Sequence, residues 1–140
     1  MGDVITILRP GDRSIETRPV RLVRLGLVGL FLFVGIAKLV GWEAMTRTFE
    51  EFGYSEDLML LVGVLETLGA VGLLVPALVP WAALGLCGIR VGAIVSHLVH
   101  DPPYRGLPAL ALLLALATIA WRRFVGAVPP GWVRSGDRWR

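Results

Sequence analysis

Residues 20–41 read VRLVRLGLVGLFLFVGIAKLVG, an apolar run interrupted by two arginines near its start and one lysine near its end. A helix needs about 20 mostly apolar residues to cross the hydrocarbon core of a bilayer. This stretch therefore predicts a transmembrane helix. Acidic residues precede it and further apolar runs follow it, so we expect it to be a permanent span and not a cleaved signal peptide.

Three further runs of the same kind occur at residues 58–78, 81–99 and 104–121. Pro76 and Pro80 bracket the turn between the second and third runs, and the DPP sequence at 101–103 ends the third. The last run is short, but the arginines that follow it can place their charged groups at the membrane surface and extend its reach. The sequence predicts an all-α, polytopic membrane protein, a four-transmembrane-helix bundle with its membrane domain at 20–122.

The composition agrees with a membrane protein and argues against other classes. Hydrophobic residues make up 55% of the chain and the mean hydropathy is +0.69, whereas soluble domains are about 45–50% apolar. A soluble bundle is excluded because the fourth run is apolar on all faces. The net charge of +3 does not indicate a nucleic-acid partner, because the arginines lie at the ends of apolar runs. The single Cys87 excludes an intrachain disulfide and a C-x-x-C redox pair.

Basic residues gather at the two ends of the chain, in an N-terminal arm at 1–19 with the start of the first span, and in a C-terminal tail at 123–140. They are Arg9, Arg13, Arg18, Arg21, Arg24, Arg122, Arg123, Arg134, Arg138 and Arg140. The loops on the opposite side hold only Arg47 and Arg105, with Lys38 nearby. Lysine and arginine mark the cytoplasmic side of a membrane protein, so we expect both termini to lie in the cytoplasm.

The connection between the first two spans has the pattern of an amphipathic helix. Its apolar positions are Trp42, Met45, Phe49 and Phe52, its polar positions include Glu43, Arg47, Glu50 and Glu51, and Gly53 ends it. We expect this helix to lie in the outer interface of the membrane. Two interpretations stay open: a connector that covers its own apolar face, or a lid over a cavity that opens outward. As a lid, it would contact a bound substrate through Trp42, Phe49 and Phe52.

Four polar residues fall inside the predicted spans, where charged side chains are rare and mark functional sites by default. At a rise of about 1.5 Å per residue, Glu66 lies about 12 Å and Arg90 about 13.5 Å from the outer ends of their spans. Lys38 and His97 lie within about one turn of the outer surface. The sequence thus predicts two levels, a deep Glu/Arg pair and a shallow Lys/His pair.

The deep pair is expected to be bonded. Each charged residue at a helix centre costs roughly 2.5–3.5 kcal/mol on insertion scales, so Glu66 and Arg90 should be paired, hydrated in a cavity, or neutralised by a shifted pKa. Arg90 and His97 are seven residues apart and share one stripe of the third span. A purely structural ion pair is the alternative to a functional site, and Lys38 and His97 alone fit snorkelling and interfacial side chains. His97 and His100 beside Asp101 provide too few ligands for zinc, so we expect no metal.

Three segments carry a family resemblance: FLFVGIAKLVG, MTRTFEEFGYSEDLMLLVGVLETLGAVGLL and VGAIVSHL, within residues 22 to 121. They resemble the DoxX-like family of small four-helix bacterial membrane proteins, with Lys38, Glu66 and His97 in register. The resemblance implies a bacterial cytoplasmic (inner) membrane location. It also implies a link to quinones and to a soluble oxidoreductase partner, since the family is named for a membrane subunit of a thiosulfate:quinone oxidoreductase. Arg90 departs from the family, whose third span is usually apolar.

Two functions follow. In the first, the protein is an enzyme that needs no cofactor and performs acid/base chemistry on an apolar small molecule, as in isomerisation, cyclisation or epoxide opening. Glu66 would be the acid/base, Arg90 would stabilise negative charge, His97 would shuttle protons, and Lys38 would help to bind the substrate. In the second, it is a non-catalytic subunit that binds a quinone or a lipid in a redox complex. Both functions are compatible with a homo-oligomer.

Overall fold

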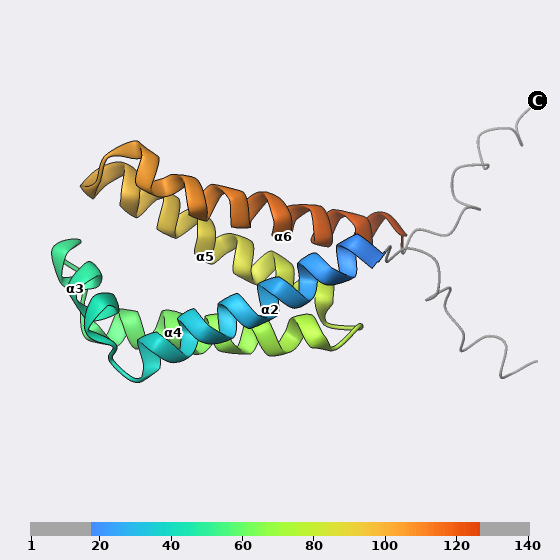
Figure 1. The fold of residues 1–140 in the computed structure, drawn as a ribbon, viewed down its shortest axis with the longest axis horizontal. Coiled ribbons are helices and arrows are strands. Elements are labelled where there is room, and N and C mark those ends of the chain that lie inside the picture. Colours follow the sequence, from blue (N-terminus) through green and yellow to red (C-terminus); the bar gives the residue numbers. More distant parts are fainter. Residues whose placement is uncertain (1–17, 127–140) are drawn as a thin grey trace, which may run out of the picture.

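The computed structural model describes residues 18–126, which fold into helices joined by short turns (Figure 1). The elements are α2 (Arg18–Leu39), α3 (Glu43–Glu51), α4 (Glu56–Leu74), α5 (Val79–His100), the 3-10 turn η1 (Pro103–Gly106) and α6 (Leu107–Gly126). Four helices are long and apolar enough to cross a membrane. The all-α, four-span prediction is confirmed, whereas most of the predicted arm and tail lies outside the described residues.

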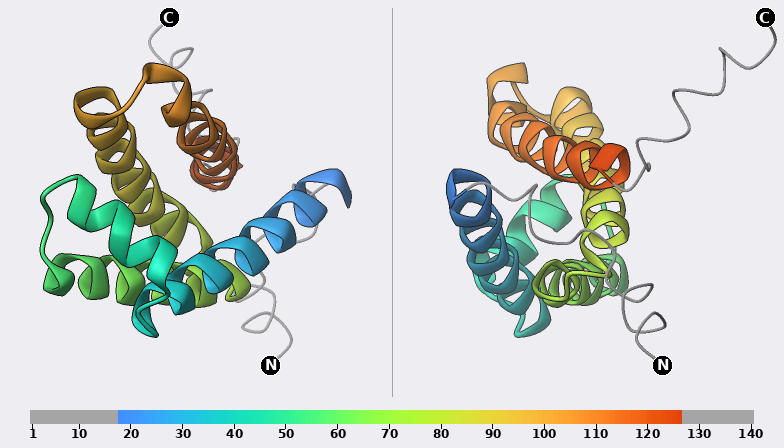
Figure 2. Two further views of the ribbon diagram at one scale, coloured as in Figure 1. Left: turned by 60° about the vertical axis from the view of Figure 1, so that its left-hand side comes forward. Right: turned by 90° about the vertical axis from the view of Figure 1, so that its right-hand side faces the viewer.

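The helices form two antiparallel hairpins. α2 packs along α4, and α5 packs along α6, while α4 and α5 are joined by a short turn and pack against each other (Figure 2). The hairpins lie together at the end where this turn is found, and their axes diverge toward α3 (Figure 1). We call the first end the inner end and the α3 end the outer end, following the predicted orientation.

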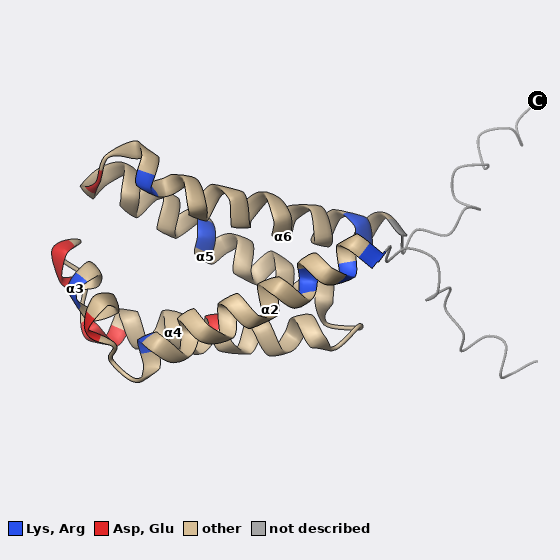
Figure 3. Cartoon of the chain, in the orientation of Figure 1, with Lys and Arg blue, Asp and Glu red and all other residues tan. Residues whose placement is uncertain are grey.

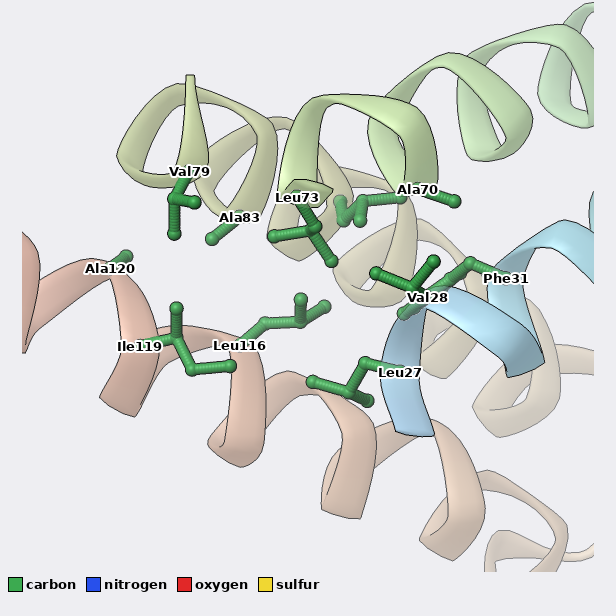
Figure 4. Packing of buried hydrophobic residues seen from close by; sticks show 11 residues of the cluster. Leu27, Val28, Phe31, Ala70, Leu73, Val79, Ala83, Leu116, Ile119 and Ala120 are labelled. Carbon is green, nitrogen blue, oxygen red and sulfur yellow. The ribbon is translucent and has the colours of Figure 1, made fainter. Parts of the chain in front are cut away.

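The apolar core lies toward the inner end, where all four spans meet (Figure 4). Its members are Leu27, Val28, Phe31, Ala70, Leu73, Val79, Ala83, Leu86, Leu116, Ile119 and Ala120. Lipid tails are as apolar as leucine, so this core stabilises the bundle by close van der Waals packing and not by withdrawal from water. The core therefore holds the inner half of the bundle together.

Large apolar side chains also cover the outside of the bundle. Leu68, Leu22 and Leu114 are each more than 60% exposed, as expected of residues that face lipid. Exposed aromatics lie near the ends of the spans, with Trp81 and Trp121 at the inner end and Trp42 and Tyr104 at the outer end. Tryptophan and tyrosine favour both membrane interfaces. The chain is a multi-pass membrane protein, and a lipid bilayer is its environment.

Prolines set the ends of two spans at positions that differ from the predicted ones. α4 ends at Leu74 instead of residue 78, because Val75 takes an extended conformation before Pro76. α5 begins at Val79, with Pro80 in its first turn, where no amide donor is needed. α6 begins only after the 3-10 turn and continues past the predicted end at residue 121 to Gly126.

The predicted amphipathic helix is present as α3. It packs against α4 and α2, and none of its residues is buried. Gly41 and Gly53 flank it with φ values of +65° and +72°, which glycine adopts without strain. The two glycines let the chain turn out of α2 into α3 and from α3 toward α4.

Acidic residues gather at the outer end of the described bundle, where Arg47 and Arg105 pair with two of them, whereas the described charged residues of the inner end are arginines (Figure 3). The described part of the inner end holds Arg18, Arg21, Arg24, Arg122 and Arg123, while the outer end holds the acidic residues of α3, the start of α4 and Asp101. Arg24 is buried, and its guanidinium donates to the carbonyl oxygen of Leu73 in the last turn of α4. This hydrogen bond satisfies a carbonyl that has no partner within its own helix.

Candidate functional site

The centre of the site is Glu66 in α4, whose side chain has no exposed surface. Lys38 from α2 binds one carboxylate oxygen, with its Nζ 2.6 Å from Oε2. Arg90 from α5 donates through Nη2 to the other oxygen, Oε1. One carboxylate therefore connects three helices through two cations. We call Lys38, Glu66 and Arg90 the ionic cluster.

A close approach of two glycines brings Lys38 to Glu66. A Cβ added at Gly35 would lie 2.5 Å from Thr67 Oγ1 and 3.0 Å from the Gly63 carbonyl oxygen. A Cβ added at Gly63 would lie 3.0 Å from both the Gly35 carbonyl oxygen and Lys38 Cβ. Small residues let transmembrane helices come this near to each other. The α2 backbone thus passes close to α4 one turn before Glu66.

Arg90 is held from two directions. Its guanidinium carbon lies 5.0 Å from the ring centroid of Phe31 in α2, which is the geometry of a cation–π contact. The side chain is 12% exposed, and its Nε atom is buried without a hydrogen-bond partner. A buried donor that lacks a partner costs free energy, since it has lost its water and gained nothing in return. Arg90 therefore has one unused donor inside the membrane domain.

The ionic cluster has an excess of positive charge. Two cations share one carboxylate, and within residues 18–126 no second carboxylate bonds to Lys38 or Arg90. A buried charge that is not neutralised is expensive at membrane depth. The cluster is therefore suited to bind a partial or full negative charge, such as a carbonyl, enolate or carboxylate oxygen.

His97 belongs to a separate polar group at the outer end. Its Nδ1 lies 2.8 Å from Asp101 Oδ2, and Arg105 Nη1 lies 2.8 Å from Asp101 Oδ1. Asp101 lies between the last two spans, and its hydrogen bond with His97, reinforced by Arg105, lowers the pKa of that carboxyl. A carboxylate can only accept, so Nδ1 carries the hydrogen and Nε2 is the acceptor when the ring is neutral.

Aromatic rings surround this outer group. Phe52, the residue after α3, stacks on His100 with ring centroids 5.0 Å apart and meets His97 edge-on at 5.4 Å. Tyr54 contacts His100 at 5.9 Å and places its hydroxyl 2.9 Å from Ser96 Oγ. The chain between α3 and α4 therefore contacts the last turns of α5 through side chains.

The predicted site residues fall into two groups and one outlier. Lys38, Glu66 and Arg90 meet in the ionic cluster, and the predicted Glu66–Arg90 pair is present. Grouping Lys38 with His97 by depth was wrong, because the lysine chain reaches along α2 to Glu66. His97 and Phe52 meet in the outer group, and Phe49 reaches it through its contact with Tyr54 at 6.1 Å. Trp42 packs edge-on against Phe33, and both rings are about half exposed.

Several residues of the site escaped the sequence analysis. Asp101 lies four residues from both His97 and Arg105. This spacing is a signal from which the contacts of Asp101 with both residues could have been predicted. Phe31 and Tyr54 carry no such signal, because their contacts depend on how separate helices are placed. No three His, Cys, Asp or Glu side chains are grouped for a metal ion within residues 18–126.

Comparison with known proteins identifies one family. A family model described as the DoxX-like family matches residues 22–128, which include α2 from Leu22 onward, the whole of α4, α5 and α6, and every residue of the ionic cluster and the outer group. Neither the curated proteins nor the solved structures contain a match.

Proposed function

Since the chain belongs to the DoxX-like family, we propose that it is a membrane binding protein for an apolar small molecule that presents an acceptor oxygen to Arg90. A quinone has this chemistry: its ring and tail dissolve in the bilayer, and its carbonyl oxygens accept hydrogen bonds. In this role the chain is the non-catalytic membrane subunit of a redox complex, and the electron-transferring centres lie on a soluble oxidoreductase partner.

The observation that carries this proposal is the unused Nε donor of Arg90 beside a cluster with excess positive charge. A ligand oxygen at this position would satisfy the donor and reduce the charge excess in one contact. Phe31 and Glu66 hold the guanidinium in place before the ligand arrives, so little rotamer freedom is lost on binding.

Glu66 acts in this proposal as a positioning residue. Its side chain has no exposed surface, and each of its oxygens already accepts from a cation. A carboxylate whose two oxygens both accept from cations has to give up one of these bonds before it can take a substrate proton, whereas Arg90 Nε has no bond to give up. The geometry therefore supports binding ahead of acid/base chemistry at Glu66.

A second candidate function rests on His97. Asp101 binds Nδ1 and orients the ring, which leaves Nε2 for proton transfer. We propose this as the alternative: acid/base chemistry without a cofactor, such as isomerisation, cyclisation or epoxide opening of an apolar molecule. Glu66 would be the acid/base, Arg90 would stabilise developing negative charge and His97 would shuttle the proton. Lys38, Trp42, Phe49 and Phe52 would contact the substrate.

The binding function is tested with a short-chain ubiquinone as the probe, added to purified protein in nanodiscs. We expect saturable quenching of tryptophan fluorescence and at least tenfold weaker binding by Arg90→Lys, which keeps the charge and loses the Nε donor. A charge-assisted hydrogen bond of about 1.5–3 kcal/mol corresponds to this change. Arg47→Lys is the matched control, because Arg47 lies on the surface of α3 and should bind the probe unchanged.

Equal affinities of Arg90→Lys and the wild type would contradict the binding proposal. The enzyme alternative makes a different prediction for the same preparation. A co-purifying apolar molecule would be converted by the wild type, and both Glu66→Gln and His97→Ala would lose this conversion while still binding the molecule.

We also propose that the protein lies in the bacterial cytoplasmic membrane with both termini in the cytoplasm. The distribution of charge in Figure 3 supports this orientation, because the described charged residues of the inner end are arginines, whereas the described acidic residues of α3, the start of α4 and Asp101 lie at the outer end. The ionic cluster then lies in the outer half of the membrane.

A further inference from the structure

The chain between α3 and α4 forms a side-chain bridge to α5. Residues 52–54, which we call the aromatic clasp, place Phe52 and Tyr54 on either side of Gly53. Phe52 contacts the rings of His97 and His100, at 5.4 Å and 5.0 Å between centroids. These contacts join the first hairpin to the outer end of the second.

The hydrogen bond of Tyr54 has a defined direction. Ser96 Oγ lies 3.0 Å from the Gly92 carbonyl oxygen, to which its single hydrogen is donated. Ser96 can then only accept from Tyr54, whose hydroxyl lies 2.9 Å away. The clasp is therefore attached to α5 by one neutral hydrogen bond and a set of ring contacts, each of which is weak on its own.

The clasp lies where the two hairpins otherwise separate. The buried residues of α5 are Val79, Ala83 and Leu86, all in its inner half. Beyond this inner half, within the described residues, the polar and ring contacts between the hairpins are those of Arg90 with Glu66 and Phe31 and the contacts of the clasp. The hairpin axes diverge toward this end (Figure 1).

The backbone of the clasp turns at Gly53. Gly53 has a φ of +72°, and no heavy atom lies within 4 Å of a Cβ added there. Hydrogen bonds from Gly53 N–H to the Glu50 carbonyl oxygen (2.9 Å) and from Tyr54 N–H to the Phe49 carbonyl oxygen (2.8 Å) close this turn, so the rings on either side leave α5 when these two bonds open or when the side chains change rotamer. His97 lies seven residues beyond Arg90, so the clasp covers α5 about 10 Å outward of the ionic cluster.

We propose that the aromatic clasp is a gate, and that a ligand reaches Arg90 from the outer end only when residues 52–54 release α5. This inference rests on the proposed binding function, because it names how access to the same site is controlled. In the closed state, the rings of Phe52 and His100 stack at the outer end of α5, and the hydroxyl of Tyr54 bonds to Ser96.

The first test needs no ligand. Ile94 lies on α5 between Arg90 and His97 and is partly buried, so Ile94→Cys in a Cys87→Ser background reports access to this stretch. We expect Phe52→Ala to accelerate labelling by a water-soluble maleimide at least fivefold. The matched control is Phe124→Ala, the same truncation of a ring that contacts Trp81 at the inner end, and it should leave the labelling rate unchanged.

The second test locks the gate. Phe52→Cys with His100→Cys, in the same background without the reporter, is joined by a reducible bis-methanethiosulfonate. Release of the short-chain ubiquinone should slow at least tenfold and recover on reduction. Trp81→Cys with Phe124→Cys, joined in the same way, should not alter release.

The outcomes separate the two proposals. Labelling of the Phe52→Ala protein at the wild-type rate, or unchanged release from the locked protein, would overturn the gate. Accelerated labelling without any binding of ubiquinone would uphold the gate and contradict the binding function. If Phe52→Ala does not fold, Tyr54→Phe replaces it in the labelling test, since it removes only the hydrogen bond to Ser96 and should still accelerate labelling.

Discussion

Glu66 is the residue on which the polar interior of this protein depends, because two cations from different helices bond to its two oxygens. Removing one cation leaves the other paired, whereas removing the carboxylate leaves both without a counter-ion inside the membrane. Lys38 and Arg90 are therefore not equivalent to Glu66, although Lys38 is also buried and Arg90 is only 12% exposed. Loss of the carboxylate should therefore destabilise the protein more than loss of either cation.

We expect Glu66→Gln to destabilise the purified protein by about 3–5 kcal/mol, the range for an uncompensated buried charge, and by more than Lys38→Met or Arg90→Met does. The measurement is thermal unfolding in detergent. Glu43→Gln is the control, since its pair with Arg47 is exposed and worth about 0–1 kcal/mol.

A double-mutant cycle measures the interaction between Glu66 and Arg90. Glu66→Gln combined with Arg90→Ala should be less destabilising than the sum of the two single changes, because the second change removes a charge that the first had stranded. Strict additivity would show that the two residues do not interact.

At the scale of elements, α4 is the helix to which the others attach, and its glycines show where. Gly63 faces α2, with the Gly35 carbonyl oxygen 3.0 Å from an added Cβ. Gly69 and Gly72 face α5, with atoms of Leu86 and Ala82 within 2.7 Å and 2.8 Å of an added Cβ. At each of these glycines the lack of a side chain lets the neighbouring helix come close to α4. The contact at Gly63 sets the distance between Lys38 and Glu66.

Gly35→Ala should force α2 away from α4, at a cost of about 1–3 kcal/mol for overpacking, and should also weaken probe binding by disturbing the ionic cluster. Gly29→Ala is the matched control on the same helix, because nothing lies within 4 Å of a Cβ there. It should be neutral or stabilising, by up to about 1 kcal/mol. Thermal unfolding in detergent compares the stability of the two variants. Equal stability would mean that α2 does not pack closely against α4 at Gly35.

The whole molecule is an asymmetric bundle. Its inner half contains the apolar core, and its outer half contains the ionic cluster, the histidines and the clasp. The charges at the two surfaces repeat this asymmetry, with arginines at the inner end and acidic residues of α3 and Asp101 at the outer end (Figure 3). The orientation in the membrane should follow from this distribution.

A topology experiment tests that expectation. Green fluorescent protein fused after Arg140 should fluoresce, as it does when it folds in the cytoplasm. In a Cys87→Ser background, Glu50→Cys on the exposed face of α3 should react with an impermeant maleimide added outside intact cells. A dark fusion together with an unreactive Cys at position 50 would mean the opposite orientation.

Most of the helices could be predicted from the sequence. The four spans follow from the length of the apolar runs, and α3 follows from the spacing of its aromatic residues, since both depend on residues near one another in the chain. The predicted and observed spans differ at their ends. For example, α4 stops at Leu74 because Pro76 forces the residue before it into an extended conformation.

The sequence by itself determined that this chain spans the membrane four times and that Glu66 and Arg90 lie deep enough to need each other. Only the tertiary structure decided that Lys38 completes their cluster, and that His97 instead joins Asp101 and Phe52. The reason is physical: depth follows from the rise per residue along one helix, whereas partners depend on how near two helices approach. The glycine contact of α2 with α4 sets that distance for Lys38.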